Sequence, residues 1–135
     1  MVRRAAAVVA AVLMTVGAQA SLQSQAGGPA TSTAEARAVG YMRTVFGAQR
    51  EYKKKHGAYA TSLASLVGNG SFTRRMATSD RGDYTVHFAA TGQGFSLGMV
   101  PKTFDAEHRA FFLNETGTVR VEPDKPANAQ SPVLK

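Results

Sequence analysis

Few residues in this chain of 135 could carry chemistry. The sequence contains no cysteine, which excludes a disulfide, a thiolate nucleophile and a thiolate zinc site. Its three histidines, His56, His87 and His108, lack the paired spacing of metal ligands, so we expect no metal site. Ser96 falls in a G-x-S-x-G sequence, but inside a predicted strand rather than at the strand-to-helix turn that exposes a nucleophile, and no histidine and acid partner is evident for it. We therefore expect a protein that is not an enzyme and that uses no cofactor.

Two carboxylates flank a short polar segment in the second half of the chain. Asp80 and Asp83 enclose Arg81-Gly82, and short acidic side chains commonly bond their own backbone in turns. Two carboxylates fall short of the roughly six to eight oxygen ligands that calcium prefers. We interpret the segment as a turn, with a cation site as the alternative.

Cationic side chains form the most distinctive pattern in the sequence. The formal net charge is +7 at pH 7, and such a charge attracts anionic partners without identifying them. On a helix, Arg43, Arg50 and Lys54 project within about 40° of one another, away from the apolar face. They are candidate contacts for an acidic protein, an anionic surface or, weakly and nonspecifically, nucleic acid. The alternative is a solvated face on which Glu51 and Lys55 form an i, i+4 pair.

These cations need a long helix, and the sequence predicts one over residues 33–56. Ser32 and Glu35 have the spacing of a capping box, in which a hydroxyl and a carboxylate each accept a backbone N–H. Gly57 can take the left-handed conformation that ends a helix. Between these ends an apolar stripe, interrupted by one glutamine, recurs at helical spacing: Ala38, Tyr41, Met42, Val45, Ala48, Gln49 and Tyr52.

The second half of the chain changes to the period of strands. Residues 84–88 and 94–100 predict one hairpin, and residues 108–113 and 118–122 predict another. The predicted fold class is α+β: one long N-terminal amphipathic helix packed on a four-stranded, mainly antiparallel sheet. The expected core joins the helix stripe to the inward side chains of the strands, namely Tyr84, Val86, Phe88, Leu97, Phe111, Leu113, Val119 and Val121.

Less regular segments connect and follow these elements. Residues 61–68 have a hydroxyl in front and a glycine behind, which predicts one or two turns of helix. Residues 73–82 are rich in polar residues and predict a loop. Residues 123–135 contain three prolines without periodicity and predict a disordered tail.

The first 32 residues have the parts of an export signal and a spacer. Arg3 and Arg4 precede an apolar run, and Ala18 and Ala20 stand where signal peptidase requires small residues. The run is shorter than the roughly 20 residues that cross a bilayer as a helix. We therefore expect a signal peptide at 1–20, a flexible linker at 21–32 and a folded domain at 33–122. An uncleaved inner-membrane anchor through residues 5–20 is the alternative.

Parts of the folded domain resemble type IV pilins and pseudopilins of bacteria. Residues 41–52 and 56–66 are similar to the "R-T-…-A-Q-…-Y-…-G-x-Y-…-S-L-x-x-L" stretch of these proteins, and F-F-L-N-E-T-G-T-V-R at 111–120 is similar to their last hairpin. The resemblance covers about residues 35–121. The sequence departs from the family at its start, because it has no glycine followed by Phe-Thr-Leu-Ile-Glu and no unbroken apolar half-helix. The resemblance implies the pilin headgroup fold on an exported chain.

These observations lead to one expected function and two alternatives. We expect a non-catalytic structural or interaction protein outside the cytoplasm, periplasmic or secreted, that acts by protein or surface contacts. The first alternative is a membrane-anchored minor pilin or pseudopilin-like subunit of a pilus or type II secretion system. The second is a small ligand-binding or hydrolytic periplasmic domain. With the signal cleaved, no stable membrane span is expected.

Overall fold

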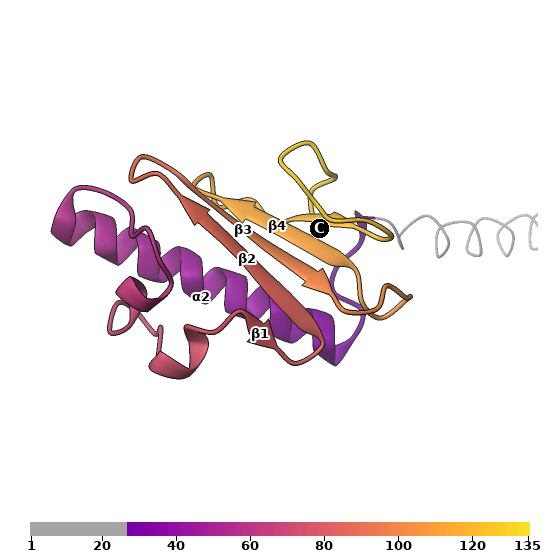
Figure 1. The fold of residues 1–135 in the computed structure, drawn as a ribbon. Coiled ribbons are helices and arrows are strands. Elements are labelled where there is room, and N and C mark those ends of the chain that lie inside the picture. Colours follow the sequence, from indigo (N-terminus) through magenta and orange to yellow (C-terminus); the bar gives the residue numbers. More distant parts are fainter. Residues whose placement is uncertain (1–26) are drawn as a thin grey trace, which may run out of the picture.

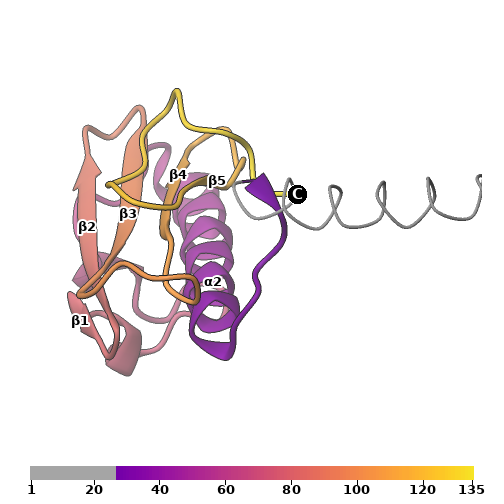
Figure 2. The ribbon, with the colours of Figure 1, turned by 90° about the vertical axis from the view of Figure 1, so that its right-hand side faces the viewer.

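A long helix, α2 (Thr33–His56), covers one face of an antiparallel sheet (Figure 1). The computed structural model describes residues 27–135. The predicted signal peptide, with Ala18 and Ala20, and linker residues 21–26 lie outside the described residues. Seen from the side, helix and sheet form two layers, and their facing side chains make the core (Figure 2). The predicted α+β class is confirmed.

Both ends of α2 lie where the sequence predicts them. The Ser32 side chain accepts a hydrogen bond from the backbone N–H of Glu35 at 3.1 Å, which satisfies one of the orphan donors of the first turn. At the other end, Gly57 has φ 77° and donates its N–H to the carbonyl of Lys53. The Glu35 carboxylate completes no reciprocal bond to Ser32. It accepts instead from the N–H of Thr31 and from Arg109.

The sheet has five strands, and the prediction of four is therefore wrong by one. Its order is β1-β2-β3-β4-β5, with every neighbouring pair antiparallel. The additional strand lies in the segment predicted as a loop, where Gly82 at φ 70° allows a tight reversal before β2. A strand of two polar residues has too short a pattern to be recognised. The strands are β1 (Asp80–Arg81), β2 (Tyr84–Ala90), β3 (Phe95–Pro101), β4 (Ala110–Asn114) and β5 (Arg120–Glu122).

The core follows the predicted faces closely. Seven of the eight strand residues predicted for it are buried, and Phe88 is partly buried against it. The connection between α2 and the sheet contributes Leu66 and Phe72, which were not predicted. It contains two 3-10 turns, η1 (Ala64–Leu66) and η2 (Arg74–Met76), and the first of them confirms the short helical segment.

Gln49 interrupts the apolar stripe because it holds this connection to the helix. Its side chain is buried, accepts from the N–H of Ala60 at 2.8 Å and donates to the carbonyl of the same residue at 3.0 Å. Both polar ends of the amide are thereby satisfied, as a buried polar group requires.

The C-terminal segment lies along β5, so the prediction of a disordered tail is wrong for its last residues. The N–H of Val121 bonds the carbonyl of Pro132, and the N–H of Leu134 bonds the carbonyl of Val119. Ser131 is 2% exposed. These bonds cover backbone groups of an edge strand that would otherwise lack partners, which explains why a segment without periodicity is fixed.

The described N-terminal residues are also held by the domain rather than standing apart from it. The N–H of Lys135 bonds the carbonyl of Gly27 at 3.2 Å, and the C-terminus lies beside the start of the described chain in both views (Figures 1 and 2). Gly28 is buried. Residues 27–32 therefore do not behave as the predicted flexible linker. Within the described range, no helix combines the length and apolarity that crossing a membrane requires.

Candidate anion-binding surfaces

The predicted basic stripe, Arg43, Arg50 and Lys54, lies on the solvent face of α2. All three side chains are exposed, and the buried face of the same helix packs on the sheet. The guanidinium of Arg50 is 5.9 Å from the centroid of the Phe46 ring. Between residues 27 and 135 no ion pair joins Glu51 to Lys55, although the sequence favours one. The stripe is therefore a row of cations without intramolecular acidic partners in the described chain.

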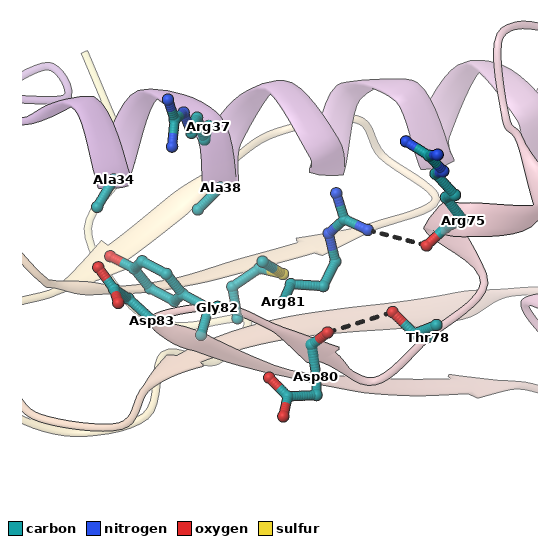
Figure 3. A pocket seen from close by; sticks show the side chains of 11 residues that line it. Ala34, Arg37, Ala38, Arg75, Thr78, Asp80, Arg81, Gly82 and Asp83 are labelled. Carbon is teal, nitrogen blue, oxygen red and sulfur yellow. Dashed lines mark hydrogen bonds between the residues drawn. The ribbon is translucent and has the colours of Figure 1, made fainter.

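A second cationic surface lines a groove between α2 and the β1–β2 turn (Figure 3). The groove has a volume of about 550 Å³. Three arginines from separate segments stand along it, Arg37 from α2, Arg75 from η2 and Arg81 from β1. Figure 3 shows Arg81 between the other two, with its guanidinium turned toward the helix. The remaining lining residues are Ala34, Ala38, Thr78, Asp80, Gly82, Asp83, Tyr84 and Met99.

Arg81 is held in place by an aromatic ring and a backbone carbonyl. Its guanidinium lies 4.2 Å from the centroid of the Tyr41 ring and donates to the carbonyl of Arg75 at 3.4 Å. The Tyr41 hydroxyl donates to the carbonyl of Met76 at 2.9 Å. Burial raises the pKa of Tyr41 to about 12, against the opposing charge of Arg81, so the ring stays neutral at physiological pH. The central cation of the groove is thus pre-positioned.

The two carboxylates at the groove are engaged by side chains outside it. Asp80 pairs with Lys102 at 2.8 Å, and Asp83 accepts from His108 Nε2 at 2.9 Å. Figure 3 shows the Asp80 carboxylate pointing away from the three arginines. Arg37 and Arg75 are exposed and have no acidic partner within residues 27–135. The groove therefore carries uncompensated positive charge.

His108 links the turn between β1 and β2 to the connection between β3 and β4. Its Nδ1 lies 2.7 Å from an Asp105 oxygen, and its Nε2 contacts Asp83. Hydrogen bonds to Asp105 and then Asp83 raise the pKa of His108 above its ordinary value. The bond from His108 in turn holds the pKa of Asp105 below its usual range. This arrangement fixes the loops and occupies both ring nitrogens.

The other two histidines lie apart from His108 and from each other. His56 and His87 are exposed, on α2 and on β2 respectively. In the described part of the chain, no three histidine or acidic side chains are grouped so as to hold a metal ion. The cation site considered at Asp80 and Asp83 is opposed by geometry, because Asp80 already pairs with Lys102 and Asp83 already bonds His108.

A buried ion pair lies at the beginning of α2. Glu35 is 0% exposed and Arg109 is 3% exposed, and Arg109 donates to the Glu35 carboxylate from its backbone N–H, Nε and a terminal nitrogen at 2.8–3.0 Å. The same guanidinium donates to the carbonyls of Gly28 and Pro29. Burial alone would raise the pKa of Glu35, but the bonds from Arg109 and Thr31 hold it below its usual value. The pair is a structural clamp with its donors engaged.

The groove was not predicted from the sequence. Arg37 and Arg81 are separated by more than 40 positions, and Arg75 lies in a segment that reads only as polar loop. The one available signal was the excess of positive charge in residues 73–82, which contain one aspartate and three arginines, Arg74, Arg75 and Arg81.

Comparisons with known proteins do not extend these observations. No family model, curated protein or solved structure matches the chain. The fold of one helix on an antiparallel sheet is established by the structure, and pilin identity stays a prediction from the sequence.

Proposed function

We propose that the protein is a non-catalytic, exported structural or interaction protein with a pilin-like domain, which contacts an acidic partner protein or an anionic surface. The observation that carries the proposal is the stripe of Arg43, Arg50 and Lys54. An exposed row of cations with no ion-paired acidic partner in the described chain gains electrostatic attraction to an anionic surface and has no internal pair to break. Weak nonspecific retention of nucleic acid follows from the same charge.

Export is part of this proposal, and it places the protein in the periplasm or outside the cell. The sequence features of residues 1–20 support it. N-terminal sequencing of protein recovered from the producing cell tests it, because a mature chain that begins at Ser21 requires cleavage after Ala20. Material that keeps Arg3 and Arg4 and sediments with lipid vesicles would instead favour an inner-membrane anchor through residues 5–20.

A membrane-anchored minor pilin or pseudopilin-like subunit is the second candidate. The helix-on-sheet architecture favours it. The start of α2 argues against a continuous helical rod, since Ser32 has an extended backbone, φ −131° and ψ 164°, and caps the first turn. A helix that ends in a satisfied cap does not continue into the preceding residues.

The stripe is tested by reversing its charge. The triple variant R43E/R50E/K54E should lose the low-salt retention on an anionic column matrix that the unmodified protein shows. A matched control, R74E/K125E/K135E, changes the net charge equally at exposed positions away from the solvent face of α2 and should stay largely retained. Equal loss in both variants, or no retention of the unmodified protein, would overturn the role of the stripe.

A further inference from the structure

We propose that the groove between α2 and the β1–β2 turn binds a short, extended, acidic segment of a partner protein. Carboxylates of that segment pair in turn with Arg37, Arg81 and Arg75 (Figure 3). The inference rests on the proposed function in taking the chain as an interaction protein. It adds a second surface and names the chemistry of its ligand.

The type of cation favours carboxylates as the ligand. Guanidinium groups present planar pairs of donors that match a carboxylate with two parallel hydrogen bonds. Arg37 and Arg75 are free of acidic partners within the described residues, so a ligand need not displace an existing ion pair. Arg81 is already oriented by the Tyr41 ring, which lowers the conformational entropy lost on binding.

The layout of the groove favours a chain over a single small anion. Arg37 and Arg75 stand toward opposite ends of the groove, with Arg81 between them (Figure 3). The cations are therefore spread along the helix rather than gathered around one point. A segment with several carboxylates satisfies all three, whereas one small ion does not.

Nucleic acid fits the groove less well than an acidic peptide. Binding of single strands depends on aromatic faces on which bases stack. Tyr84 is the aromatic residue that lines the groove, and it is 2% exposed. The nearby Tyr41 ring is buried and has Arg81 over its face. Neither ring offers a stacking surface.

The groove and the stripe are separate surfaces. At 100° per residue, Arg37 projects from α2 about 120° around the helix from Arg43. This separation allows a matched comparison, because each surface holds two exposed arginines on which no described ion pair depends: Arg37 and Arg75 in the groove, Arg43 and Arg50 in the stripe.

The test measures binding of a fluorescein-labelled hexaglutamate peptide to the full chain by fluorescence anisotropy at low salt. In R37Q/R75Q, the dissociation constant should rise at least about tenfold, since two charge-assisted contacts are lost. In R43Q/R50Q, which removes the same charge, it should rise less than about threefold. R37K/R75K keeps the charge without the paired donors and should fall between these variants. Thermal unfolding followed by circular dichroism verifies that each variant is folded.

Several results would overturn the inference. Equal losses in R37Q/R75Q and R43Q/R50Q would mean that net charge, not the groove, binds the peptide. Competition by inorganic phosphate at the concentration of peptide carboxylate would indicate a small-anion site. If binding of a single-stranded oligonucleotide depends on Arg37 and Arg75 while binding of the peptide does not, the groove is a nucleic-acid site instead. Loss in R43Q/R50Q alone would reject the groove and leave the proposed function standing, whereas absence of binding by any anionic probe would reject both.

Discussion

Arginine has opposite roles in two regions of this fold. At the beginning of α2, Arg109 is buried and bonds the Glu35 carboxylate together with the carbonyls of Gly28 and Pro29. In the groove, Arg37 and Arg75 are exposed and lack acidic partners within residues 27–135. The residue type is the same in both places. The difference is that the protein itself supplies acceptors for the donors of Arg109 and supplies no acidic partner to Arg37 or Arg75 in the described residues.

This difference separates cations that hold the fold from cations available to a ligand. A buried charge must have its partners, because an isolated one is too costly to desolvate. An exposed guanidinium costs little without a partner and can gain one on binding. Arg81 is intermediate, because it lies on the Tyr41 ring and bonds one carbonyl while its charge faces the groove. The following predictions test this gradation.

The largest effect is expected at Arg109. Arg109→Met leaves the buried Glu35 carboxylate without its cation and removes the donors to two carbonyls, so the free energy of unfolding should fall by about 3–5 kcal/mol. Urea denaturation measures the loss. Adding Glu35→Gln removes the uncompensated charge and keeps one acceptor oxygen, for the N–H of either Thr31 or Arg109, so it should recover part of the loss. A loss below about 1 kcal/mol in R109M would contradict the clamp.

A smaller effect is expected at Arg81. Arg81→Gln removes a cation from the face of the Tyr41 ring, and the free energy of unfolding should fall by about 0.5–1 kcal/mol. The control is Arg37→Gln, an exposed change that should stay within about 0.5 kcal/mol of the unmodified protein. Urea denaturation of both variants decides the matter, since equal stabilities would show that Arg81 is as free as its neighbours.

The smallest effect is expected at His108, and it depends on pH. Its pKa is raised in the folded protein by Asp105 and Asp83, relative to about 6.5 in an unfolded chain. The stability that it contributes is therefore complete below the unfolded value and is lost as the pH rises through the folded one. Compared with H108Q, the unmodified protein should have its greatest advantage near pH 5.5 and lose it toward pH 8. The advantage is modest because both aspartates are at least half exposed, and an advantage that grows with pH would contradict this account.

The sequence was sufficient for most of the fold because local signals and the packed faces agree. The cap at Ser32, the stop at Gly57 and the alternation from Tyr84 to Phe88 each depend on near neighbours. β1 was missed because two polar residues form too short a pattern, and the ordered tail was missed because its pairing with β5, not a period of its own, fixes it. The bonds from Val121 to Pro132 and from Leu134 to Val119 leave no periodic pattern to detect.

The candidate site was less accessible from the sequence than the fold. Helical spacing alone placed Arg43, Arg50 and Lys54 on one exposed face. The groove forms only where α2 and the β1–β2 turn bring Arg37 and Arg81 to one surface, and no rule of sequence spacing predicts that arrangement. The Glu35 carboxylate was assigned to a cap because its buried partner, Arg109, lies 74 positions away.

The contacts of residues 27–29 determine how the domain would respond to mechanical load. Arg109 holds two of their carbonyls, and Lys135 bonds a third. A pull transmitted through the preceding residues would reach this cross-linked corner before it reached the first turn of α2. The first turn of α2 would unwind only after the bonds of Arg109 broke, so the guanidinium that pairs with a buried carboxylate would also protect the helix from force applied at Gly27.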